Sequence, residues 1–172
     1  MSYVLLEAFL PNHENPIEAH PAEAVLAMCL WGEARGGTLE AKAAVASVIL
    51  NRVKAKAGRF WPIEAQSLNE KVRGVILRPW QFSCFNADDP NRAKLLKPEQ
   101  HDTLAVWHEC AGVAAMALDG LLTDPTRGAD HYFSPVYDTT PEGKIVIRNK
   151  PKWADGKTPT LTLRGFMFYK IG

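Results

Sequence analysis

The feature that most constrains the fold is a change of pattern at Asp124-Pro125. Before this point, apolar residues recur at steps of three and four, which is the period of amphipathic helices. After it, short runs of β-branched and aromatic residues alternate with turn-forming residues, which is typical of strands. We therefore expect residues 1–172 to form a single α+β domain, with a mainly helical lobe over about residues 20–123 and a small antiparallel β lobe over about 124–172. The 172 residues, 47% of them hydrophobic, suffice for one packed core.

Four helices are expected in the first lobe, over about residues 22–34, 39–56, 63–72 and 98–122. Pro21 suits the first position of the first helix, and Gly36 and Gly37 end it. Thr38 is a good N-cap for the second helix. Residues 81–91 are expected to be mainly loop, because Ser, Asn, Asp and Pro gather there.

Three strands are expected in the second lobe, over residues 131–134, 144–148 and 160–168. The last two could pair as a hairpin around Asp155-Gly156. From Pro141 onward, seven Lys and Arg residues face only two acidic ones, although the chain as a whole carries +1. This basic segment is either a solvated hairpin or a surface that attracts an anionic polymer or lipid headgroup. The net charge gives no reason to expect a nucleic-acid partner.

Cysteine usage and the N-terminus bear on the cellular compartment. The three cysteines, Cys29, Cys84 and Cys110, show no framework spacing, so we expect reduced thiols and synthesis in the cytoplasm. The apolar run Tyr3–Leu10 is short, has no preceding positive charge and ends at Pro11, so no signal peptide is expected. No stretch is long enough to span a bilayer.

Glu33 is the candidate catalytic residue, within the run Trp31–Gly37. It shares an apolar stripe with Leu26 and lies in the last turn of the first expected helix. Burial and the negative end of the helix dipole both disfavour a charged carboxylate there, and a general acid needs the protonated form. The alternative is a structural Glu paired with Arg35 or Arg52.

Four blocks of residues, in order along the chain, carry a more specific pattern. They are Trp31-Gly32-Glu33-Ala34-Arg35-Gly36, then Ala44-Val45-Ala46-Ser47-Val48-Ile49-Leu50-Asn51-Arg52-Val53, then Gln81-Phe82-Ser83-Cys84, and finally Asp124-Pro125-Thr126 with Gly128-Ala129 and His131-Tyr132. Together they resemble the spore-cortex-lytic cell-wall hydrolases, the SleB-like family. The resemblance covers roughly Leu26–Phe133, with a weaker echo at Phe168-Tyr169.

The resemblance implies a lysozyme-like or lytic-transglycosylase-like fold that cleaves the bond between N-acetylmuramic acid and N-acetylglucosamine. Glu33 stands at the family's catalytic position. Asn51 and Arg52, in the second block, are predicted to support the Glu33 segment rather than to touch sugar. Two departures concern substrate preference: Gly37 replaces a common acidic residue, and Asp130 replaces a common small hydroxyl residue.

The number of catalytic carboxylates decides the mechanism. A hydrolytic glycosidase needs two carboxyl groups about 5–9.5 Å apart. Asp88 and Asp89 read as a turn, whereas Asp130 adjoins His131 in a matched block. Strand alternation would point Asp130 and His131 to opposite faces. The resemblance favours Glu33 alone, as in a lytic transglycosylase that leaves anhydro-sugar ends; a hydrolytic lysozyme with a second carboxylate is the alternative.

The predicted substrate-binding residues are Gln81, Phe82, Ser83, His131 and Tyr132. Gln81 and Ser83 could hydrogen-bond acetamido groups, with Phe82 packing inward between them. Tyr132 would offer a flat apolar face and a hydroxyl to a sugar ring, beside His131. The alternatives are a polar loop that satisfies its own backbone and a buried, packed His-Tyr pair.

Three other classes of protein are alternatives to a glycosidase. A zinc peptidase is disfavoured, because His108-Glu109 is not followed by a second His at ligand spacing. A cysteine peptidase could use Cys84 with His131, and a non-catalytic wall-binding module would have little use for Glu33. No metal or organic cofactor is implied. The expected partner is the peptidoglycan glycan strand, and the protein is expected to be a monomer. It resembles phage lysins, which are made in the cytoplasm and act on the bacterial wall.

Overall fold

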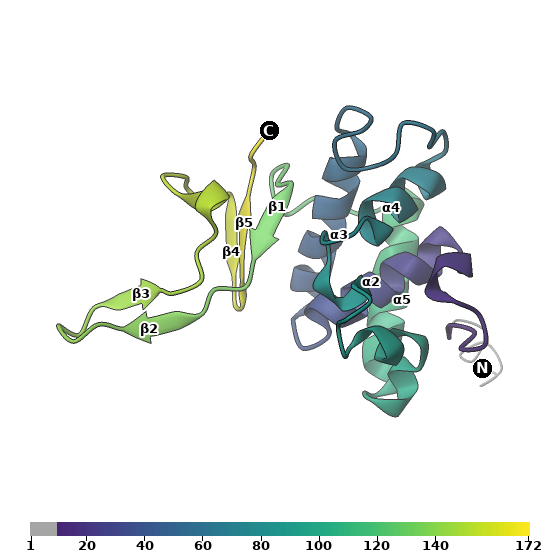
Figure 1. Ribbon diagram of the computed structural model, residues 1–172, viewed down its shortest axis with the longest axis horizontal. Helices are drawn as coiled ribbons and strands as arrows, with labels where there is room; N and C mark the ends of the chain where they lie inside the picture. The colour runs from purple at the N-terminus through teal and green to yellow at the C-terminus, as the bar shows by residue number, and fades with distance from the viewer. Residues whose placement is uncertain (1–9) are drawn as a thin grey trace.

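The computed structural model describes residues 10–172, which form a helical body beside a β-rich part (Figure 1). The described α-helices are α2 (Ala22–Ala34), α3 (Leu39–Val53), α4 (Leu68–Leu77) and α5 (Leu104–Leu118). Short 3-10 turns cover Ile17–Ala19, Ser83–Phe85, Arg92–Leu96, Pro98–Gln100 and Lys152–Ala154. The expected α+β class is confirmed. Within residues 10–172, none of the helices combines the length and apolar character needed to cross a bilayer. The signal-peptide prediction falls on residues that, apart from Leu10, lie outside the described part.

Local capping decides where the helices begin. Thr38 caps α3 as expected, because its Oγ1 accepts a hydrogen bond from the Ala41 N–H at 3.2 Å. Pro21 is the N-cap of α2 rather than its first residue. The helix expected over residues 63–72 lies instead at 68–77, because Ser67 and Glu70 form a reciprocal capping box that starts it later.

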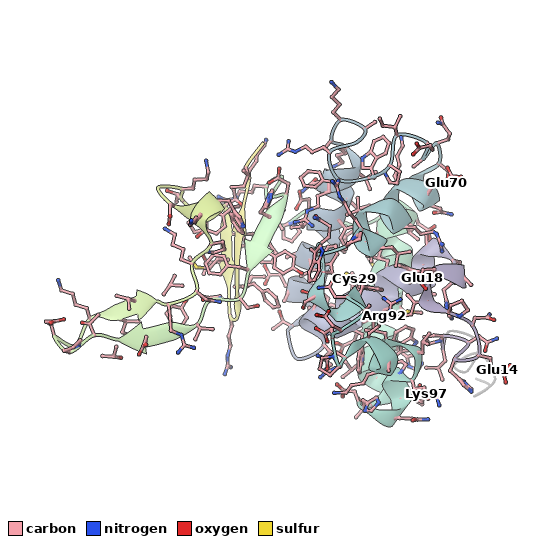
Figure 2. The ribbon with its side chains drawn as sticks, in the orientation of Figure 1. Glu14, Glu18, Cys29, Glu70, Arg92 and Lys97 are labelled. Carbon is pink, nitrogen blue, oxygen red and sulfur yellow. The ribbon has the colours of Figure 1, made fainter. Side chains whose placement is uncertain are left out.

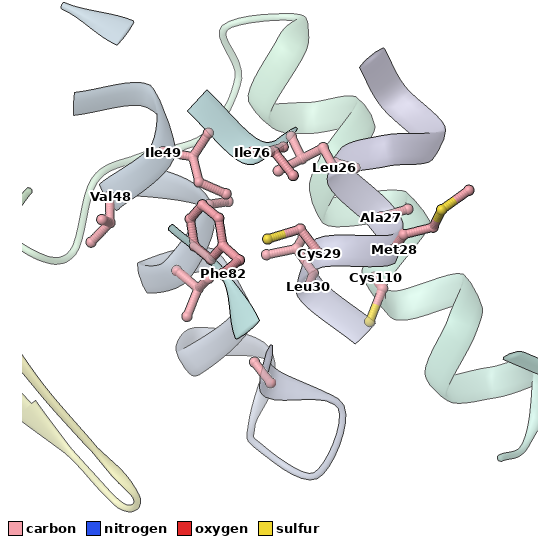
Figure 3. Packing of buried hydrophobic residues seen from close by; sticks show 14 of the residues in the cluster. Leu26, Ala27, Met28, Cys29, Leu30, Val48, Ile49, Ile76, Phe82 and Cys110 are labelled. Carbon is pink, nitrogen blue, oxygen red and sulfur yellow. The ribbon is translucent and has the colours of Figure 1, made fainter. Parts of the chain in front are cut away.

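Helix α2 lies at the centre of the helical body and packs against α3, α4 and α5. Every residue from Val25 to Trp31 is at most 1% exposed, so the helix is buried all round rather than along one stripe (Figure 3). A helix that is apolar on all sides belongs in the interior. Glu33 and the half-buried Gly32 lie in its last turn, where the helix leaves the core.

The β-rich part contains two separate antiparallel sheets. In the first, the strand order is β1 (His131–Phe133), β5 (Phe166–Tyr169) and β4 (Leu161–Leu163). The second consists of β2 (Tyr137–Thr139) and β3 (Ile145–Ile147), a ribbon that projects away from the helices (Figure 1).

The expected hairpin between residues 144–148 and 160–168 is wrong. Strand β3 pairs with β2, and the segment 160–168 is divided into β4 and β5, which pair with each other. Gly165 lies between them with φ of +86°, a left-handed conformation that suits glycine and reverses the chain. Three short apolar runs do not specify which two will pair, because that choice depends on packing distant in sequence.

The Asn51 side chain, near the end of α3, joins the helical body to the segment that leads into β1. Asn51 Nδ2 donates to Asp124 Oδ2 and to the Ala129 carbonyl, both at 2.9 Å. Asp124 also accepts hydrogen bonds from the N–H groups of Thr126 and Gly128, at 2.7 and 3.0 Å. The Asp124-Pro125 turn is therefore held by α3, and it sets where β1 begins.

This junction should be sensitive to acid. Burial alone would raise the pKa of Asp124, but hydrogen bonds from Thr126, Asn51 and Gly128 hold it below its ordinary value. Such a carboxylate stabilises the fold above its unfolded pKa of about 4, and this contribution is lost as the pH falls through the folded pKa. We expect Asp124→Asn to lower the urea midpoint clearly at pH 7 and far less near pH 3. An equal loss at both pH values would contradict this assignment.

Candidate functional site

The Glu33 carboxylate lies where the helical body meets the first sheet. Its Oε2 accepts a hydrogen bond from the Tyr132 hydroxyl at 2.8 Å, across 99 residues of sequence. The Tyr132 ring packs against Phe166 and Phe168 of β5, with ring centroids 5.9 and 5.7 Å away. Burial, followed by the charge of Glu33, raises the pKa of Tyr132 well above its ordinary value, so the hydroxyl stays protonated and donates.

Cys84 approaches Glu33 from the loop after α4. A Cβ atom on Gly32 would lie only 2.6 Å from Cys84 Sγ, so the thiol packs directly on the last turn of α2 and Gly32 permits that approach. Burial first, then the charge of Glu33 and a hydrogen bond to it, raise the pKa of Cys84 well above its ordinary value. The thiol is therefore protonated, which argues against Cys84 as a peptidase nucleophile with His131.

Arg52 is a buried cation that joins three segments. Its Nε donates to the Asp130 carbonyl at 2.7 Å, and Nη1 donates to Gln81 Oε1 at 3.3 Å. The guanidinium lies over the rings of Phe60 and Phe82, at 5.2 and 5.4 Å from their centroids. Arg52 thus supports the segments that carry Tyr132 and Cys84.

The charge of Glu33 favours the cationic form of Arg52, but within the described residues Glu33 forms no direct ion pair with that arginine or with Arg35. Arg35 lies over the ring of Trp31, 4.3 Å from its centroid, and Arg52 donates to the Asp130 carbonyl.

Gln81, Phe82 and Ser83, which were predicted to bind substrate, differ in their exposure. Gln81 is half-buried and bonded to Arg52, and Ser83 is exposed. Phe82 packs inward as expected and, at 2% exposure, belongs to the core (Figure 3). Arg92 anchors this loop, since it donates to the Phe85 carbonyl and pairs with Glu18 (Figure 2).

His131 and Tyr132 do not line the same surface, contrary to expectation. Consecutive strand residues point to opposite faces, so Tyr132 faces Glu33 and His131 faces away. The His131 ring packs against Trp153 and Phe60, at 5.0 and 5.9 Å between centroids. Its Nδ1 is bonded to Asp130 Oδ1 at 2.9 Å.

Two of the candidate second carboxylates, Asp130 and Asp89, are engaged in other hydrogen bonds. Asp130 is buried and accepts hydrogen bonds from the backbone N–H groups of Ile171 and Gly172, at 2.8 and 3.1 Å, besides its hydrogen bond with the ring Nδ1 of His131. The expectation that Asp130 and His131 point apart is wrong, because the strand begins only at His131. Asp89 Oδ1 caps a turn by accepting from the Asn91 N–H at 2.7 Å.

No metal site is found in the described part of the chain, where no group of three or more His, Cys, Asp and Glu side chains is placed to hold an ion. Glu109, beside His108, instead pairs with the buried Lys42 at 2.9 Å.

Comparison with known proteins agrees with this architecture. A family model described as Cell Wall Hydrolase matches residues 36–169, a range that begins three residues after Glu33. The spore cortex-lytic enzyme of Halalkalibacterium halodurans is 32% identical over 128 residues, which are 74% of this chain and 31% of that protein. The chain therefore spans about a third of the length of that relative.

The fold is similar to the crystal structure of the catalytic domain of the Bacillus cereus SleB protein. The TM-score is 0.52 at 23% identity, and the match covers 94% of this chain and 96% of that one. At this identity the likeness concerns the fold. The family model, in contrast, matches well over half of the sequence, and so this chain belongs to the cell wall hydrolase family of enzymes.

Proposed function

We propose that this protein cleaves the glycan strand of peptidoglycan between N-acetylmuramic acid and N-acetylglucosamine, with Glu33 as the general acid. The observation that carries this proposal is the hydrogen bond from Tyr132 to Glu33, which holds a carboxyl group at the junction of a helical and a β lobe. That arrangement supports a lysozyme-like or lytic-transglycosylase-like reading of the fold. Residues 1–172 would act as one catalytic unit, a monomer, on the bacterial wall.

The proposed chemistry uses one carboxyl group twice. With Oε2 held by Tyr132, we assign Oε1 of Glu33 to carry the proton to the glycosidic oxygen as the bond to the sugar carbon breaks. The 6-hydroxyl of the muramic residue then attacks that carbon and returns its proton to Glu33, which restores the acid. The hydrogen bonds that occupy Asp130 and Asp89 support this scheme over one with a second carboxylate.

The scheme predicts the chemical nature of the product. Purified sacculi digested by the enzyme should yield fragments ending in 1,6-anhydromuramic acid, one water lighter than the hydrolytic product by mass spectrometry. Reducing muramic ends would show that water is the nucleophile, and would favour the hydrolytic lysozyme alternative.

Tyr132→Phe should slow the reaction without disturbing the sheet. The ring and its contacts with Phe166 and Phe168 remain, but the donor to Glu33 is lost. Because a misplaced acid affects the transition state more than substrate binding, we expect kcat to fall about tenfold, with little change in KM. Tyr137→Phe, which removes a hydroxyl from an exposed ribbon residue, is the matched control. Equal kcat values for the two variants would contradict the positioning role.

A further inference from the structure

Trp80 combines two features that rarely occur together. Its side chain is 76% exposed, and its backbone adopts φ of +67°, in the left-handed region. This conformation is uncommon for any residue with a Cβ atom and is strained for bulky ones. Glycine or asparagine would suit the position better on grounds of stability.

The packing of the described residues does not account for this strain. The Trp80 ring lies outside the core, and within residues 10–172 it takes part in none of the aromatic or cation–π pairs. The hydrogen bond between Trp80 and Asn86 comes from the Trp80 backbone N–H. A strained position that holds a large, unpacked aromatic side chain points to a function for that side chain.

The loop around Trp80 is closed by hydrogen bonds and belongs to the candidate site. The Trp80 N–H donates to Asn86 Oδ1 at 3.1 Å, and the Asn86 N–H donates to the Ser83 carbonyl at 2.9 Å. Between these residues lie Gln81, bonded to Arg52, and Cys84, which packs on Gly32 beside Glu33. The exposed indole is therefore mounted on the same short loop that contacts the catalytic helix.

We propose that Trp80 is a stacking platform for a pyranose ring of the glycan strand, next to the position of cleavage. A flat indole face matches the apolar C–H face of a β-1,4-linked sugar, and the backbone that carries the indole is held by the hydrogen bond to Asn86. This inference rests on the proposed function and names a binding residue for the same site.

Three substitutions separate stacking from folding. Trp80→Gly removes the ring and relieves the backbone, so its melting temperature should equal or exceed that of the unmodified protein. Trp80→Phe keeps a smaller ring, and Leu121→Ala removes another largely exposed apolar side chain, far along the chain, as a matched control. We expect KM for soluble glycan strands, stripped of stem peptides, to rise about tenfold in Trp80→Gly and less in Trp80→Phe. The kcat of both variants and the KM of Leu121→Ala should stay within about twofold of the unmodified values.

A binding measurement tests the stacking role of Trp80 independently of the catalytic role of Glu33. Glu33→Gln protein, with and without Trp80→Gly, is sedimented with purified sacculi, so that capture does not depend on cleavage. Loss of capture only in the double variant supports the platform even if no cleavage is found. Unchanged capture and unchanged KM in Trp80→Gly would overturn the platform, while leaving the role of Glu33 intact.

Discussion

Replacing Glu33 with glutamine is expected to reduce lysis of purified sacculi by about 10²-fold or more, the usual scale for loss of a general acid. Glutamine has nearly the shape of the acid, and its amide oxygen can still accept the hydrogen bond from Tyr132. It cannot, however, deliver a proton to the glycosidic oxygen. The melting temperature should therefore change little, which assigns the loss to chemistry rather than to folding.

Two companion variants sharpen this test. Glu33→Asp keeps the carboxyl group but withdraws it by one methylene from the glycosidic oxygen, so it should retain more activity than Glu33→Gln. Glu40→Gln neutralises an exposed acid in the first turn of α3 and should leave lysis unchanged. Activity of Glu33→Gln within a few-fold of the unmodified enzyme would refute the assignment.

Arg52→Met is expected to be the most destabilising single change among the residues of the site, at about 3 kcal/mol in the free energy of unfolding. Methionine fills much of the volume but leaves the Asp130 carbonyl and the Gln81 amide oxygen without their donor. Both acceptors lie near the junction between lobes, so wall lysis should fall with stability. Urea unfolding, followed by circular dichroism, measures the first effect.

Arg59→Met provides the matched control. The Arg59 side chain is 41% exposed, lies over the same Phe60 ring at 4.8 Å and donates to the Gly172 carbonyl at 2.9 Å. Because water screens this side chain and can replace it, its loss should cost less than about 1 kcal/mol. If Arg52→Met were no more destabilising than Arg59→Met, the junction would not depend on the buried arginine.

The sequence alone determined those features whose energies are local. Helix α2 was predicted at its observed bounds, and Thr38 as the cap of α3, because helical periodicity and capping act within a few residues. The same locality explains the misplaced α4, where the reciprocal bonds of Ser67 and Glu70 outweighed the apolar pattern that begins earlier. The position of Glu33 at a helix end could be read for the same reason.

Only the tertiary structure decided which distant groups meet. The strand at 144–148 was recognised, but residues 160–168 were predicted as one strand and form two, β4 and β5. The pairing partners were also wrong, since pairing depends on how sheets pack rather than on the strands themselves. The contact of Tyr132 with Glu33 and the exposure of Trp80 were equally beyond local reasoning. This hydrogen bond across 99 residues forms because β5 packs the tyrosine ring and α2 ends beside it. Interactions within either segment alone do not determine that the two side chains come into contact.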